Sequence, residues 1–180
     1  MSCILDFLTN PLVIIDLVII AILLYLLTPM LFGAAYYPSS RDLKILLKEI
    51  FDKYFRDYKT IKMIDLGSGF GRVCFWASSI DPRVTCVGVE IDPIKIAWSN
   101  FIRRIKRLDD RVYFKRGDLF KEYLGEYDLI YMFLWTSTVA RLEDKILREA
   151  KRGAVIVSLE HPFKKIRAYK WRKYYIARLE

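Results

Sequence analysis

A glycine-rich segment, Asp65–Gly71 (DLGSGFG), constrains the fold of this chain more than any other feature. It ends the apolar segment Thr60–Leu66, predicted to be a buried strand, and precedes a predicted short helix over Arg72–Ile80. Glycines let the backbone adopt conformations that other residues avoid and pass close to a ligand. The N-terminus of the following helix offers unpaired N–H groups to an anionic group. The segment therefore predicts a ligand-binding turn between a strand and a helix.

The rest of the sequence continues this alternation of strand and helix patterns. Further strands are expected at Val84–Glu90, Arg111–Arg116, Tyr127–Trp135 and Ala154–Leu159, helices over residues 43–58, 93–105 and 139–147, and a closing hairpin over Arg167–Glu180. The expected strands are nearly continuous in aliphatic residues. This pattern is typical of a mostly parallel sheet covered by helices on both faces.

The helix after the second strand has clear start signals. Asp92 is the expected N-cap and Pro93 suits the first turn. Its apolar stripe consists of Ile94, Ala97, Trp98, Phe101, Ile102 and Ile105.

Glu90 ends the second strand, roughly twenty residues after the glycine turn, where an acidic side chain can bind both hydroxyls of a ribose. The nicotinamide fingerprint is G-x-G-x-x-G, whereas Gly67, Gly69 and Gly71 are spaced G-x-G-x-G and follow Asp65. The combination predicts a ligand that contains adenosine.

These residues, together with Gly117-Asp118 after the third strand, resemble the seven-strand S-adenosylmethionine-dependent methyltransferases over residues 36–180. The resemblance implies an α/β, Rossmann-like seven-strand methyltransferase sheet with a C-terminal antiparallel hairpin. It implies S-adenosyl-L-methionine as the cofactor, with Asp65 at the methionine amino group, Glu90 at the ribose and Asp118 at the adenine edge. The glycine loop, formed by Gly67, Ser68, Gly69 and Gly71, completes the implied cofactor site. A simple turn carboxylate is the alternative for Asp118.

Four segments carry a narrower resemblance: Tyr36–Ser39, Asp65–Arg72, Gly88–Glu90 and Met132–Leu134. They are similar to the archaeal broad-specificity protein-lysine methyltransferases. They are also similar to the membrane-anchored mitochondrial enzymes that methylate lysines of the ATP synthase c-ring protein and the adenine nucleotide translocase. The resemblance implies a protein-lysine N-methyltransferase that acts on a lysine side chain at the membrane.

Two alternative functions stay open. The basic clusters Arg103–Arg107 and Lys164–Arg167 suggest an RNA methyltransferase, although such runs are usually solvated faces and nucleic acid is not the expected partner. The other alternative is a non-enzymatic, membrane-tethered scaffold that keeps the methyltransferase fold.

Methyl transfer from a sulfonium needs mainly the positioning of a nucleophile, so no catalytic residue is assigned. A lysine acceptor must be neutral, and desolvation in an apolar slot lowers its pKa. Tyr37, Phe133 and Trp135 are the candidate walls of that slot, and ordinary core aromatics are the alternative for Phe133 and Trp135. His161, the single histidine, is expected to be structural.

Charge is unevenly distributed along the chain. Residues 1–35 contain only Asp6 and Asp16 as charged residues, whereas all 30 Lys and Arg residues lie from Arg41 onward. A helix of about 23 residues over 12–34 would span roughly 34 Å, which predicts a single membrane span in an N-terminal anchor, residues 1–35. A cleaved signal peptide and a buried core helix are the alternatives. The positive-inside rule places the N-terminus outside and the catalytic domain, residues 36–180, in the cytoplasm.

The cysteines Cys3, Cys74 and Cys86 are odd in number and form no C-x-x-C pair. Neither a disulfide framework nor a metal site is therefore expected, and buried thiols in a reducing compartment are predicted. The net charge of +9 is consistent with an anionic membrane surface, nucleic acid or an acidic protein as partner.

Overall fold

The computed structural model describes residues 10–31 and 41–180. The chain divides into two compact units, residues 1–36 and 37–180, each described by itself. The described part of the first unit is helix α2 (Pro11–Leu31). Its N-terminus is capped by the Asn10 side chain, which accepts a hydrogen bond from the Leu12 N–H at 3.0 Å.

Within the described residues, no helix combines the length and the apolar character that crossing a bilayer requires. The membrane span predicted over residues 12–34 is therefore not supported by the structure, and its last residues, 32–34, lie outside the described part.

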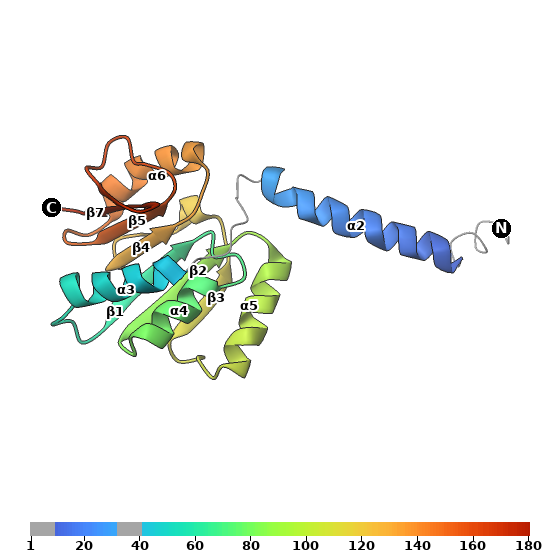
Figure 1. The fold of residues 1–180 in the computed structure, drawn as a ribbon, viewed down its shortest axis with the longest axis horizontal. Coiled ribbons are helices and arrows are strands. Elements are labelled where there is room, and N and C mark those ends of the chain that lie inside the picture. Colours follow the sequence, from blue (N-terminus) through green and yellow to red (C-terminus); the bar gives the residue numbers. More distant parts are fainter. Residues whose placement is uncertain (1–9, 32–40) are drawn as a thin grey trace. The chain divides into compact units, whose positions relative to one another are not determined.

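The second unit contains a seven-stranded sheet with the order β3-β2-β1-β4-β5-β7-β6 (Figure 1). Its strands are β1 (Ile61–Leu66), β2 (Val84–Glu90), β3 (Val112–Arg116), β4 (Leu129–Met132), β5 (Val155–Leu159), β6 (Tyr169–Trp171) and β7 (Tyr174–Arg178). Strands β1 to β5 pair in parallel, and β7 pairs antiparallel with both β5 and β6. This order confirms the predicted seven-strand sheet with its closing hairpin.

Helices lie on both faces of the sheet (Figure 1). They are α3 (Arg41–Tyr54), α4 (Arg72–Ile80), α5 (Pro93–Ile105) and α6 (Thr136–Glu149), with the 3-10 turn η1 (Leu119–Lys121). Alternate strand residues point to opposite faces. Thus Ile61 and Met63 of β1 join a core with α3 and α4, whereas Ile64 and Leu66 join a second core with α6.

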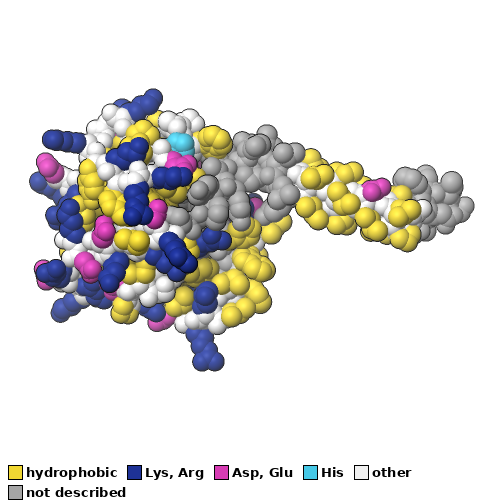
Figure 2. Space-filling model, viewed as in Figure 1, with side chains coloured by type: hydrophobic (Ala, Val, Ile, Leu, Met, Phe, Trp, Pro, Cys, Tyr) yellow, Lys and Arg dark blue, Asp and Glu magenta, His cyan; other side chains and the backbone are white. Residues whose placement is uncertain are grey.

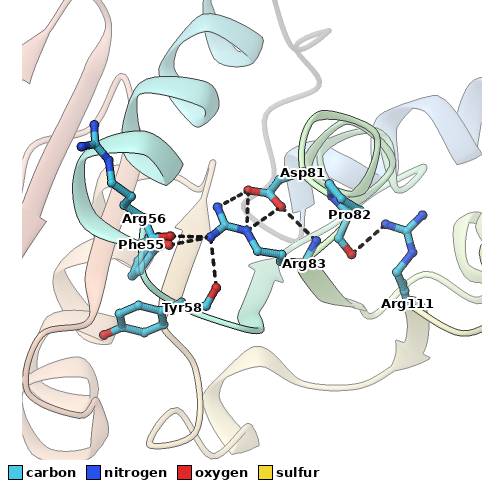
Figure 3. A network of polar contacts seen from close by, with 7 residues as sticks. All are labelled: Phe55, Arg56, Tyr58, Asp81, Pro82, Arg83 and Arg111. Carbon is cyan, nitrogen blue, oxygen red and sulfur yellow. Dashed lines mark hydrogen bonds and ion pairs between the residues drawn. The ribbon is translucent and has the colours of Figure 1, made fainter.

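Arg83 fixes the edge of the sheet opposite to the glycine turn (Figure 3). Its Nη1 atom donates hydrogen bonds to the carbonyl oxygens of Phe55, Arg56 and Tyr58, which follow α3, at 3.0, 2.8 and 3.0 Å. Its Nη2 atom lies 2.6 Å from Oδ2 of Asp81, and this hydrogen bond lowers the pKa of Asp81 below its usual range. One guanidinium thus holds the end of α3 against the turn between α4 and β2.

The prediction that the cysteines are unpaired thiols is wrong for two of the three. Cys74 of α4 and Cys86 of β2 form a disulfide, with their Cα atoms 5.4 Å apart. Both side chains are fully buried in the core between α4 and the sheet. A spacing of 12 residues carries no disulfide signal in the sequence, because only the packing of α4 on β2 brings the two Cβ atoms within range. Cys3 lies outside the described residues.

The apolar stripe predicted on α5 exists, but most of it points away from the core. Ile94, Trp98, Phe101 and Ile105 are between 51% and 61% exposed, and the buried residue of this helix is Ser99. The helix begins as predicted, since the Asp92 side chain accepts the N–H groups of Ile94 and Lys95.

Candidate functional site

The carboxyl ends of β1 and β2 meet at the glycine turn. The N–H groups of Gly67 and Ser68 both donate to the carbonyl oxygen of Val89, at 2.9 and 3.0 Å, and so attach the turn to the end of β2. Gly67, Gly69 and Gly71 have positive φ angles of 82°, 53° and 75°. This left-handed backbone explains why glycine is required at alternate positions.

The space around these glycines differs. A Cβ atom at Gly67 would lie 2.9 Å from Leu134, and one at Gly71 would overlap the ring of Phe114. At Gly69, in contrast, no heavy atom of the described protein lies within 4 Å of where a Cβ would stand. Gly69 is therefore the position where the loop leaves room for a ligand to approach the backbone.

Glu90 shapes this loop with its carboxylate, which is 7% exposed. Oε2 accepts the N–H of Gly69 at 2.9 Å, and Oε1 accepts the N–H groups of Ile91 and Asp92 at 2.9 and 3.1 Å. Oε2 thus accepts one hydrogen bond from the loop, and a carboxylate oxygen can accept two. The structure therefore brings together Gly69 and Glu90, as the sequence predicts, and Glu90 retains capacity for hydroxyl donors.

Asp65 lies at the base of the loop and is almost fully buried, at 2% exposed. Its Oδ2 atom and the hydroxyl of Ser68 have no hydrogen-bond partner among the described residues. Burial, and to a smaller extent the charge of Glu90, raises the pKa of Asp65 to about 8. A buried acceptor without a partner costs about 1–3 kcal/mol. A ligand carrying an ammonium group would therefore fit this site by satisfying Asp65.

Asp118 follows the end of β3. The N–H of Gly117 donates to the Glu90 carbonyl oxygen at 3.0 Å, so the chain before Asp118 runs beside the end of β2. The Asp118 side chain caps η1 by accepting the N–H of Phe120 at 2.9 Å, and the residue is exposed. Its observed contact is that of a turn carboxylate.

The candidate walls of the acceptor slot lie after β4. Phe133 is half-buried and stacks on His161, with ring centroids 6.4 Å apart, and Trp135 is 43% exposed at the N-terminus of α6. His161 is held by Thr136, whose Oγ1 atom lies 2.8 Å from its Nδ1 atom. These contacts agree with a structural role for His161. Tyr37 lies outside the described residues.

Two buried groups beside the site were missed from the sequence. Tyr131 of β4 pairs in register with Asp65, and burial raises its pKa well above the ordinary value. Glu143 of α6 is 1% exposed, and its Oε1 atom accepts the N–H groups of three successive residues after β5: Lys164, Lys165 and Ile166. No sequence signal marks either, since each depends on strand register or on a loop folding over a helix.

A family model described as the ANTKMT methyltransferase domain matches residues 65–170. The adenine nucleotide translocase lysine N-methyltransferase of Mus musculus is 33% identical over 101 residues, covering 56% of this chain and 44% of that protein. A Homo sapiens lysine N-methyltransferase named for the ATP synthase c-ring protein is 27% identical over 101 residues, covering 56% and 42%. The match thus spans less than half the length of these curated relatives.

Solved structures support the same fold. An RNA methyltransferase from Salinibacter ruber, in complex with S-adenosyl-L-homocysteine, superposes with a TM-score of 0.65 at 24% identity, covering 79% of this chain and 92% of that one. A putative caffeoyl-CoA O-methyltransferase from Staphylococcus aureus gives a TM-score of 0.56 at 13% identity, covering 68% and 58%. These likenesses show the fold alone. The family model, in contrast, begins at Asp65 and extends over more than half of the sequence, and this chain belongs to the ANTKMT methyltransferase domain family.

Proposed function

We propose that this chain is an S-adenosylmethionine-dependent protein-lysine N-methyltransferase. The observation that carries the proposal is the buried Asp65 carboxyl group, without a partner among the described residues, beside the open backbone of Gly69. When bound, S-adenosyl-L-methionine supplies a methyl group on a positively charged sulfur. The protein then has to hold the cofactor and present a neutral nucleophile in line with that methyl group.

The cofactor would be held at the ends of β1, β2 and β3. Asp65 would accept hydrogen bonds from the amino group, and Glu90 would accept them from the ribose hydroxyls. The glycine loop (Gly67, Ser68, Gly69 and Gly71) would approach the cofactor through its backbone. Asp118 is retained as a proposed adenine contact through its position after Gly117, which is hydrogen-bonded to Glu90.

Lysine is proposed as the acceptor because two relatives are lysine N-methyltransferases by name, one for the adenine nucleotide translocase and one for the ATP synthase c-ring protein. An apolar slot favours the neutral lysine that the transfer requires. Phe133 and Trp135, next to the end of β4, and Tyr37 are the proposed walls. Action at the membrane, with the catalytic domain on the cytoplasmic side, stays a prediction from the apolar segment 12–34 and the basic residues after it.

Transfer of radiolabelled methyl groups tests the proposal. The purified protein is incubated with labelled S-adenosylmethionine and a membrane or a cytosolic extract, then treated with protease or nuclease. We expect label in protein, recovered as methyl-lysine after hydrolysis, and loss of label with Glu90→Ala. Lys62→Gln, at an exposed ion pair with Glu126, is the matched surface control and should keep the activity.

Other outcomes have defined meanings. Label that resists protease but disappears with nuclease would replace lysine by RNA as the acceptor. No label, combined with no binding of S-adenosylhomocysteine by calorimetry, would leave only the non-enzymatic scaffold.

A further inference from the structure

Helix α5 packs on the domain with its polar side. Ser99 Oγ donates to the Gly69 carbonyl oxygen at 3.3 Å, and Asn100 Nδ2 donates to the Phe114 carbonyl oxygen at 3.4 Å. One turn later, Arg103 Nη1 donates to the Val112 carbonyl oxygen at 3.2 Å. Three polar side chains on one side of the helix therefore bind the backbone of the glycine turn and of β3. These bonds fix the rotation of α5 about its axis.

The opposite side of α5 is apolar and faces solvent. We define the α5 face as Ile94, Ala97, Trp98, Phe101 and Ile105, which recur at helical spacing and are all exposed. Ile91, in the turn before the helix, is 50% exposed and extends the face. Trp98 and Phe101 contact each other, with ring centroids 6.1 Å apart. Figure 2 shows hydrophobic side chains gathered where α5 lies in Figure 1.

A contiguous exposed apolar patch of this kind marks an interaction surface, whereas single exposed apolar residues need no explanation. The described structure also fixes the helix in this orientation by polar bonds, so rotation would break them to bury the stripe. The face is thus a stable property of the fold.

The charge bordering the face is positive. The acidic residues near α5 are paired: Asp92 with Lys95 at 3.6 Å, Asp109 with Arg103 at 3.2 Å, and Asp110 with Arg111 at 3.9 Å. In addition, Arg104, Lys106 and Arg107 are exposed at the C-terminal end of the helix. An apolar helical face of Ile, Trp and Phe with cations beside it matches a helix that lies in the interface of an anionic bilayer.

We propose that the α5 face docks on the surface of an anionic lipid bilayer. The apolar side chains enter the boundary between headgroups and acyl chains, and Arg104, Lys106 and Arg107 lie at the level of the lipid phosphates. Long cationic side chains reach headgroups while their stems stay on apolar surface. This surface is separate from residues 12–34, and the inference does not depend on lysine as the methyl acceptor.

A second copy of the chain fits the face less well. In a parallel pairing of two α5 helices, the cations Arg104, Lys106 and Arg107 would face their own copies. In an antiparallel pairing they would face the helix N-terminus, which carries the positive end of the helix dipole. Lipid phosphates meet neither repulsion.

The test uses the full chain and vesicles whose lipids carry brominated acyl chains, which quench a tryptophan that enters the bilayer. Vesicles of phosphatidylcholine alone are compared with vesicles that also contain phosphatidylglycerol. We expect quenching on the anionic vesicles that decreases at high salt, and loss of most of it in Trp98→Phe. Because the signal is assigned to Trp98, vesicle binding through another part of the chain does not imitate it.

Matched double variants complete the test. Ile94→Ser/Ile105→Ser should weaken docking about tenfold. Ile45→Ser/Leu147→Ser removes two exposed apolar side chains from α3 and α6 and should leave it unchanged. Equal melting temperatures and equal binding of S-adenosylhomocysteine show that the variants are folded.

Two outcomes overturn the proposal. One is the absence of Trp98 quenching in the unmodified chain, or quenching that Ile94→Ser/Ile105→Ser does not reduce. The other is a dimer in lipid-free sedimentation that this double variant dissociates, which would assign the face to a second copy. Failure of methyl transfer alone would bear on the proposed function and not on the α5 face.

Discussion

The Oε2 atom of Glu90 lies 2.9 Å from the backbone nitrogen of Gly69 and joins the end of β2 to the turn after β1. The side chain proposed to bind the ribose is thus also the one that shapes the glycine loop in the free protein. Its other oxygen accepts two further backbone N–H groups. Loop geometry and cofactor affinity therefore depend on one carboxylate.

Replacing Glu90 tests this double role. Glu90→Ala removes the acceptor of three N–H groups and should lower the affinity for S-adenosylhomocysteine at least ~100-fold, since hydrogen bonds to a charged group are among the stronger ones. Glu90→Gln keeps one acceptor oxygen and should lie between the two. Calorimetric titration measures the affinities, and unchanged binding by Glu90→Ala would show that the ribose does not bind here.

Asp65 should make cofactor binding depend on pH. Its pKa of about 8 means that the free protein carries a proton there at neutral pH, whereas an ammonium ligand needs the carboxylate. Binding should therefore release a proton below pH 8, and the affinity should fall about tenfold for each pH unit below that value. Proton release is measured by calorimetry in buffers of different ionisation enthalpy, with Asp65→Asn as the control that releases none.

The same carboxyl group affects stability in a defined direction. Its folded pKa of about 8 lies above the ordinary aspartate pKa of 3.8, so the folded state binds the extra proton between these values. The stabilisation from this proton is complete below pH 3.8 and is lost as the pH rises to about 8. Denaturant melts across this range should show a smaller decrease for Asp65→Asn than for the unmodified chain. Parallel curves for the two proteins would contradict the raised pKa.

Two glycines should separate binding from stability. Gly69→Ala meets open space and a positive φ, so it should cost about 1 kcal/mol in stability while blocking the ligand's approach. Gly71→Ala has a positive φ as well and overlaps the Phe114 ring, so its loss of stability should be larger, about 3 kcal/mol. Thermal melts and titrations with S-adenosylhomocysteine give both quantities, and equal melting temperatures for the two variants would contradict this difference.

The Cys74–Cys86 disulfide should stabilise the fold by about 3 kcal/mol, because it closes a short loop in the unfolded chain. Peptide mapping without reductant should recover the two cysteines as one linked pair. Denaturant melts of Cys74→Ala/Cys86→Ala then measure the loss of stability. Quantitative alkylation of both cysteines in unfolded, unreduced protein would show that the bond is absent.

Much of the fold could be predicted because its signals are local. The strand Val84–Glu90 and the helix Arg72–Ile80 have the predicted bounds, since turns marked by Asp81-Pro82 and by glycine delimit them. The fourth strand is shorter than predicted, at Leu129–Met132, because Trp135 already forms the N-terminus of α6. An aliphatic run alone does not show where a strand leaves the sheet.

The remaining features depend on contacts between distant residues. The periodicity of α5 indicates an apolar face but not the direction in which Ser99, Asn100 and Arg103 orient it. The pairing of Asp65 with Tyr131 follows from strand register, which the sequence does not specify. Within the site, Asp65, Gly69 and Glu90 were predictable because each chemical requirement is met by few residue types.

Phe114 of β3 fills the space that side chains at both Gly71 and Gly88 would need. These three positions, from three separate segments, therefore share a single volume. We expect a larger residue at either glycine to be tolerated only together with a smaller one at position 114. Substitutions at these sites should be interdependent, so a change that is harmful alone becomes acceptable in the presence of its compensating partner.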